Sequence, residues 1–215
     1  HAMRMKDACG VGVVADIKGR SSHEIVRQGI QVLVNLDHRG ARGADPDTAD
    51  GSGILIQLPD AHLRSRCKDA DIILPSPGSF GVGMTFLPRN QKIRAQCMEH
   101  IEGIVIAEGQ EFIGWREVPV DSKAVGPVAR SRQPVIKQFF VGQDEACTNN
   151  AAFERQLYII RKSIEQTINT LNARTNEFYI CSLSARLIVY KGMIACEELA
   201  AFYEDLQDKA LVSAF

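Results

Sequence analysis

A cysteine near the start of the chain, Cys9, is the residue best suited to nucleophilic chemistry. It begins the glycine-rich stretch CGVGVVAD over residues 9–16. If the residues before it were removed, its free α-amino group, with a pKa of about 7.7–8.0, could take the thiol proton. One residue would then supply both the nucleophile and the general base. While Ala8 remains attached, this nitrogen is an amide, and the alternative for Cys9 is a small buried thiol.

A second candidate is a polar segment rich in glycine and charge. It contains His38, Arg39, Gly40, Asp45, Asp47 and Asp50. A calcium loop needs a downstream glutamate and a phosphate loop needs G-K-[ST], and the segment has neither. The balanced charge of the chain gives little support to RNA binding by its RGARG run. Two interpretations stay open: a turn whose aspartates cap backbone N–H groups, and a dyad of His38 with Cys9.

A third polar cluster lies near the C-terminal end. Ser182, Ser184 and Arg186 precede the sequence YKGM at residues 190–193. Residues 178–183 and 187–190 are predicted to be two strands joined by a tight turn. A hairpin with a polar turn explains these side chains without any chemistry.

Short strands and helices must position these candidates. Strands are predicted over residues 9–16, 54–58, 80–87, 111–118, 134–141, 178–183 and 187–190. Helices are predicted from the Ser21–Glu24 capping box to before Gly40, and over residues 91–107, 151–171 and 197–207. Gly10 and Gly12 share one face of the first strand, which indicates a close approach to its backbone. Several connections are short and hairpin-like, so the pattern favours a layered α+β fold.

Composition excludes several classes of protein. The 215 residues, 45% of them hydrophobic, suffice for one domain or at most two. The 25 Lys and Arg balance 26 Asp and Glu, which argues against nucleic-acid binding driven by bulk charge. No run reaches the length of a membrane span. The six cysteines form no C-x-x-C pair and no zinc spacing, so we expect free thiols in a reducing cytoplasm.

Taken in order along the chain, the motifs resemble those of one family. The matching segments are DACGVG at residues 7–12, HRGA at 38–41, GAD at 43–45, TADGSGI at 48–54, GVGM at 81–84, GWR at 114–116, SLS at 182–184 and YKGM at 190–193. The set resembles the glutaminase domain of glutamate synthase large chains, a class-II glutamine amidotransferase of the N-terminal-nucleophile hydrolase superfamily. The resemblance covers nearly the whole chain from Asp7 onward.

The resemblance implies a domain division, a fold and a site. Residues 1–8 would be a tag remnant and a leader, and residues 9–215 the N-terminal part of an αββα four-layer sandwich. Cys9 would be the nucleophile that forms a thioester with L-glutamine, and Arg39 would lie beside it. The ammonia would pass to 2-oxoglutarate in a synthase part that holds FMN and an iron–sulfur cluster and is supplied by a reductase subunit or ferredoxin. We expect no cofactor or metal in this chain, because its scattered cysteines form no cluster-binding run, and no nucleic-acid or membrane partner.

Three features of the family are absent from these residues: the Asn-Gly pair of the oxyanion hole, the arginine motif that grips the glutamine carboxylate, and the acid that holds the substrate amino group. No Asn-Gly pair, the family's oxyanion-hole motif, occurs in the sequence. Loss of one oxyanion donor lowers rates by about 10²–10³-fold, so we expect these residues alone to hydrolyse little glutamine. Open sheet edges would favour a homo-oligomer. Two alternatives remain: a non-catalytic, amidotransferase-like binding or scaffold module that keeps its leader, and a redox role for Cys9, which needs a partner thiol that the sequence does not place.

Overall fold

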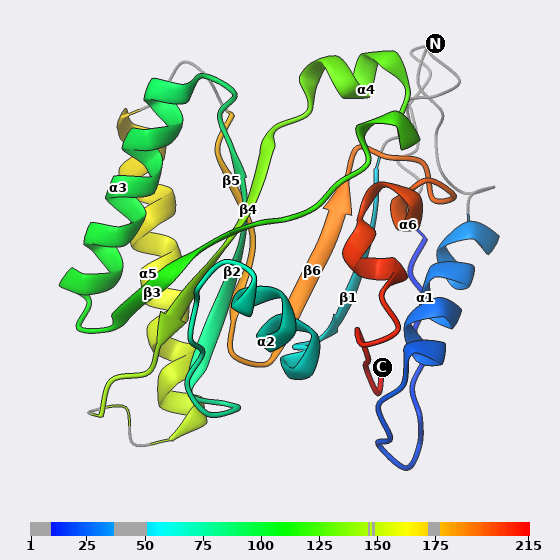
Figure 1. Cartoon of the computed structure of the whole chain (residues 1–215), viewed down its shortest axis with the longest axis horizontal. Coiled ribbons are helices and arrows are strands. Elements are labelled where there is room, and N and C mark those ends of the chain that lie inside the picture. The colour runs from blue at the N-terminus through cyan, green and yellow to red at the C-terminus, as the bar shows by residue number, and fades with distance from the viewer. Residues whose placement is uncertain (1–9, 37–50, 146, 148, 172–176) are drawn as a thin grey trace, which may run out of the picture. The chain divides into compact units, whose positions relative to one another are not determined.

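The computed structural model describes residues 10–36, 51–145, 147, 149–171 and 177–215. The helices are α1 His23–Asn35, α2 Asp60–Lys68, α3 Gln91–Ala107, α4 Pro127–Arg132, α5 Asn150–Leu171 and α6 Leu199–Phe202, with 3-10 turns η2 Ser122–Ala124 and η3 Glu204–Gln207. The strands are β1 Ser52–Gln57, β2 Phe80–Leu87, β3 Glu111–Glu117, β4 Val135–Gly142, β5 Tyr179–Ser184 and β6 Leu187–Gly192 (Figure 1). This mixture of helices and strands confirms the predicted α+β class.

Two compact units divide the chain. Unit 1 comprises residues 1–54, 119–133 and 191–215, and unit 2 comprises residues 55–118 and 134–190. Each unit is therefore assembled from segments that are far apart in the sequence.

Unit 2 is built on a four-stranded antiparallel sheet in the order β3-β4-β2-β5. β2 and β4 stay in register from the Phe80–Gly142 pair to the Leu87–Val135 pair. α3 and α5 cover one face of this sheet (Figure 1). The core on that face combines side chains of both helices with those of the strands, among them Cys97, Ile101, Phe139, Leu157, Ile164 and Leu183.

The two long helices of unit 2 begin and end close to the predicted positions. α3 starts after Asn90, whose side-chain oxygen accepts hydrogen bonds from the backbone N–H groups of Lys92 and Ile93 at 3.0 and 3.1 Å. α5 buries one apolar stripe completely: Phe153, Leu157, Ile160, Ile164 and Ile168. Because these residues recur every three or four positions, they share one face of the helix, as the sequence predicted.

Helix α1 of unit 1 starts with a different cap from the predicted one. The N-cap is Ser22, not Ser21, and its Oγ accepts a hydrogen bond at 3.4 Å from the first turn of the helix. Glu24 pairs with Arg27 at 2.9 Å and forms no capping box. Ser22 also forms an isolated backbone bridge with Ser213, which holds it in an extended conformation and moves the start of the helix by one residue.

The predicted first strand is wrong for the residues that the structure describes. Residues 10–16 form no strand there. Their backbone is tied to a distant segment by the Asp16 N–H, which donates a hydrogen bond to the Ala214 carbonyl at 2.8 Å. Alternating glycine and β-branched residues suit a strand, but a strand also needs a paired neighbour, and no described strand lies in register with this segment.

The predicted hairpin of β5 and β6 is also wrong. β5 belongs to the four-stranded sheet, whereas β6 pairs with β1 in a separate two-stranded sheet. The Glu154 carboxylate accepts hydrogen bonds from Ser184 Oγ and the Ala185 N–H at 2.9 and 2.8 Å. Ser184 Oγ in turn accepts from the N–H groups of Arg186 and Leu187 at 3.0 and 3.1 Å. These side-chain hydrogen bonds, and not those of a hairpin, hold the turn between β5 and β6. The chain passes from one sheet to the other at this turn.

The last predicted helix, over residues 197–207, is broken into α6 and η3. The break is at Tyr203, which has an extended conformation (φ −92°, ψ 102°). Its ring is fully buried, and its hydroxyl donates a hydrogen bond to the Lys191 carbonyl at 2.8 Å. The backbone of Tyr203 also forms an isolated bridge with Val120. This bridge and the buried ring outweigh the helical spacing of the sequence.

Candidate active site

The backbone that follows Cys9 lies against the end of α1. A Cβ atom on Gly10 would lie 3.3 Å from the Cβ atom of Leu36, which caps α1. A side chain on Gly12 would overlap Val32, one turn earlier in the same helix. The two glycines therefore permit a close approach, as their spacing predicted.

The residues that pack here are close in the sequence to both predicted site residues. Cys9 directly precedes Gly10, and Arg39 follows Leu36 by three residues. Cys9, Arg39 and His38 all lie outside the described residues. The roles of Cys9 and Arg39 stay predictions.

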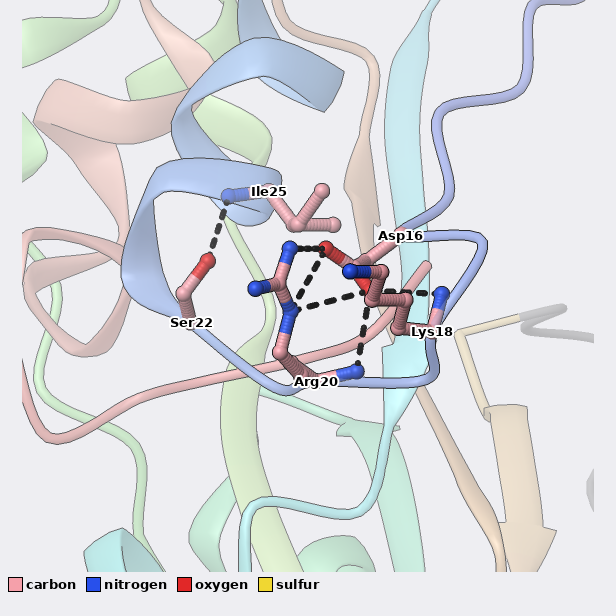
Figure 2. Close-up of polar contacts among 5 residues, drawn as sticks. All are labelled: Asp16, Lys18, Arg20, Ser22 and Ile25. Carbon is pink, nitrogen blue, oxygen red and sulfur yellow. Dashed lines mark hydrogen bonds and ion pairs between the residues drawn. The ribbon is translucent and has the colours of Figure 1, made fainter.

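A tight turn closes the glycine-rich segment at Asp16. Its carboxylate accepts hydrogen bonds from the N–H groups of Lys18 and Arg20 at 2.8 and 3.2 Å, and from the Arg20 guanidinium at 2.8 Å. Figure 2 shows the Arg20 side chain pointing back at Asp16. The side-chain hydrogen bonds from Arg20 lower the pKa of Asp16 from 3.8 to about 2. A carboxylate with so low a pKa is a poor base near neutral pH, so Asp16 is suited to anchoring the turn.

The end of the second polar candidate meets the YKGM motif within unit 1. Gly51 has a φ of +122°, and a Cβ atom there would lie 2.9 Å from the Gly192 carbonyl oxygen. Beside it, Ser52 Oγ donates a hydrogen bond to the Ile194 carbonyl at 2.9 Å. Two motifs that the sequence analysis treated separately are thus brought together. The spacing of the motifs gave no signal for this contact, because 142 residues separate Ser52 from Ile194.

The serines of the third candidate hold the chain where β5 ends and β6 begins. Ser182 Oγ accepts a hydrogen bond from the Val189 N–H at 3.2 Å, and Ser184 is held by Glu154 as described above. These contacts agree with a structural role for both serines. Glu154 was not predicted, because a carboxylate on the polar side of a helix gives no sign in the sequence that it will bind a turn.

The described cysteines are poorly placed for nucleophilic chemistry. Cys67, Cys97 and Cys181 are buried, and Cys147 and Cys196 are half-buried. Burial raises the pKa of the Cys67 thiol to about 11, so this thiol stays protonated near neutral pH. Within the part of the chain that the structure describes, no cluster of three or more His, Cys, Asp or Glu side chains could hold a metal ion. No described helix is long and apolar enough to cross a membrane.

Comparison with protein families decides the family of the chain. Residues 9–215 match the family model for class-II glutamine amidotransferases. The chain belongs to this enzyme family. The matched region of the amidotransferase begins at Cys9 and includes Arg39, so both predicted site residues fall inside it.

Known relatives of this amidotransferase are much longer chains. The glutamate synthase [NADPH] large chain of Bacillus subtilis is 46% identical over 209 residues, which cover 97% of this chain and 13% of the relative. The ferredoxin-dependent glutamate synthase 2 of Synechocystis is 37% identical over 210 residues, covering 98% and 13%. The glutamate synthase [NADPH] large chain of Azospirillum brasilense is 39% identical over 210 residues, covering 97% and 14%. The amidotransferase thus spans about an eighth to a seventh of these relatives.

Proposed function

We propose that this amidotransferase is the glutaminase part of a glutamate synthase and that Cys9 is its nucleophile. The family match that begins at Cys9 carries the proposal. The relatives from Bacillus subtilis, Synechocystis and Azospirillum brasilense support it, because all three are glutamate synthases. The proposed substrate is L-glutamine, and the proposed location is the cytoplasm.

The proposed reaction starts after the peptide bond between Ala8 and Cys9 has been hydrolysed. The freed α-amino group accepts the proton of Cys9 Sγ, and the thiolate attacks the side-chain amide carbon of glutamine. The carbon–nitrogen bond then breaks, the nitrogen takes up a proton and leaves as ammonia, and a γ-glutamyl thioester remains. Water attacks this thioester, which releases glutamate and restores the thiol.

Arg39 is proposed to bind the substrate beside the nucleophile. A guanidinium is always charged and can donate several hydrogen bonds to a bound substrate. The packing of Gly10 against Leu36 supports this role. It brings the residue after Cys9 close to a residue only three positions before Arg39.

The proposed partner is the synthase part of the same enzyme, where ammonia and 2-oxoglutarate combine. FMN, an iron–sulfur cluster and either NADPH or ferredoxin as reductant would serve that part. The glutaminase steps above change no oxidation state and use none of these groups.

Replacement of Cys9 tests the proposal in the natural protein that carries these residues. Wild-type protein should hydrolyse glutamine, and Cys9→Ala should lower kcat by about 10³-fold or more, because removal of a nucleophile abolishes the covalent route. Cys147→Ala, at a half-buried cysteine, should change kcat less than twofold. Full activity of Cys9→Ala would exclude Cys9 as the nucleophile. An inactive wild-type protein that still joins Ala8 to Cys9 would favour the non-catalytic alternative.

The 215 residues alone should be a poor glutaminase in the same assay. Their sequence has no Asn-Gly pair to stabilise the oxyanion of the tetrahedral intermediate. Turnover at the rate of the natural protein would show that another donor does this work.

A further inference from the structure

Residues 10–16 of unit 1 have the pattern of a β-strand, and their partner strand is not among the described residues. Their side-chain positions alternate: Gly10 and Gly12 face α1, whereas Val11 and Val13 are each 83% exposed. Within the described part of the chain, no residue accepts a hydrogen bond from the backbone N–H groups of residues 11–15. An apolar, extended segment with such an edge is a template for another strand.

We infer that residues 10–16 dock the stretch of chain that follows Phe215 in the natural protein, as an antiparallel strand. The relatives of Bacillus subtilis and Synechocystis are long enough to supply such a stretch, because the matched residues cover only 13% of each. The inference does not rest on the proposed function, since it pairs two backbone segments and assigns neither of them a step of catalysis.

Two described contacts already begin this pairing. The Asp16 N–H donates a hydrogen bond to the Ala214 carbonyl at 2.8 Å. Ser22 and Ser213 form an antiparallel bridge, with N–H to carbonyl distances of 2.9 and 3.3 Å. The bridge sets the relative direction of the two segments. Continued in that direction, the chain after Ala214 runs alongside residues 10–15.

Both sides of this starting point are fixed within unit 1. The Asp16 carboxylate accepts hydrogen bonds from the N–H groups of Lys18 and Arg20, which closes the turn that follows the segment (Figure 2). On the other side, His23 Nδ1 on α1 donates a hydrogen bond to the Leu211 carbonyl at 2.9 Å. Because these residues are already ordered, an incoming strand has to restrict little besides itself.

The continuation of the same chain is favoured over a second copy by its attachment to Ala214. A segment joined to its docking site by a short link has an effective concentration in the millimolar range, whereas a second copy has to associate from solution. A strand rises about 3.4 Å per residue in both segments, so about seven residues are enough to cover residues 10–16.

The direction of the Asp16 N–H predicts which backbone groups bind the incoming strand. Every second N–H group of a strand points to the same edge, so those of Gly12 and Val14 should point the same way as that of Asp16. In the natural protein, their hydrogen exchange should be at least about 100-fold slower than that of Ile17, which lies in the turn outside the pairing. Exchange at Gly12 and Val14 as fast as at Ile17 would overturn the inference.

Photocrosslinking of the natural protein identifies the occupant. The photoreactive residue p-benzoylphenylalanine replaces Val13 in one variant and Ile17 in the control, and both of these side chains are exposed, so both variants should fold. Residues on the same face of neighbouring strands lie about 5 Å apart. The probe at position 13 should therefore crosslink within the same chain to one of the first ten or so residues after Phe215, and the probe at position 17 should not.

The other outcomes contradict the inference. A crosslink from position 13 to a second copy would make this edge an interface between chains, and a crosslink to any other part of the same chain would assign it a different partner. The absence of a crosslink in folded protein would show that nothing pairs with this edge. Neither readout requires glutamine turnover, so a failure of the proposed function leaves this test intact.

Discussion

Asp16 is one side chain that fixes a whole turn, and its carboxylate must be ionised to do so. The hydrogen bonds from Arg20 lower its pKa from 3.8 to about 2. Because the folded-state pKa lies below that of the unfolded chain, the interaction stabilises the fold above about pH 4 and is lost as the pH falls toward 2. Arg20 is 71% exposed, so we expect added salt to weaken the effect.

The pKa of Asp16 can be measured from its side-chain carbon shift against pH. The wild-type midpoint should lie near 2, and Arg20→Ala should move it up toward 3.8. Arg27→Ala, which breaks the Glu24 pair on α1, serves as the control and should leave the Asp16 midpoint in place. A wild-type midpoint of 3.8 that stays the same in Arg20→Ala would contradict the contact between Asp16 and Arg20.

At the scale of residues, chemistry was easier to predict than position. The types and order of Cys9, Arg39 and the glycines around them pointed to the family, because each serves a local chemical need. Ser52 and Glu154 act on groups far away in the sequence, at Ile194 and at the turn after β5. No local pattern encodes such contacts, so only the fold shows them.

Among the elements, the glycines of β2 give the sharpest test of packing. A Cβ atom on Gly83 would overlap the ring of Phe139 on the neighbouring strand β4. Gly83→Ala should therefore lower the free energy of unfolding by about 1–3 kcal/mol, because the ring has to move. Gly103 lies inside α3 with nothing within 4 Å of an added Cβ atom. Gly103→Ala should raise the free energy of unfolding by about 0.5–1 kcal/mol.

Urea denaturation of both variants measures the two changes side by side. Opposite signs are expected, since the substitution is the same and only the surroundings differ. A Gly83→Ala protein as stable as wild type would mean that β2 and β4 are not packed as described.

Periodic elements were predictable and sheet partners were not. β2 spans Phe80–Leu87 and α3 spans Gln91–Ala107, as predicted, because continuous apolar runs and helical spacing are local signals. The pairing of β6 with β1 depends on contacts between distant segments, which no local pattern contains. α2 and α4 were not predicted at all. α2 carries six charged or polar side chains with only a few buried residues, and α4 is a single short stretch after Gly126.

At the scale of the whole molecule, the four-stranded sheet leaves two edge strands, β3 and β5. Edge strands present unpaired backbone groups, so we expect the 215-residue chain to self-associate as its concentration rises. Tyr179 lies on β5 and is 42% exposed. Tyr179→Lys should reduce self-association, because a charged side chain disfavours pairing at an edge.

Sedimentation velocity over a range of concentrations measures this association. Tyr158→Lys is the matched control, since Tyr158 is an exposed tyrosine on α5 rather than on the sheet. A chain that stays monomeric at all concentrations would show that the edges of the sheet are not available for pairing.

Cys9 is proposed to become a free N-terminal nucleophile. The most direct measurement is the intact mass and N-terminal sequence of the natural protein that carries these residues, purified in folded, soluble form. We expect a mature chain that begins at Cys9. A folded protein that keeps Asp7 and Ala8 joined to Cys9 would contradict it, because the amide nitrogen of Cys9 could not then act as the base.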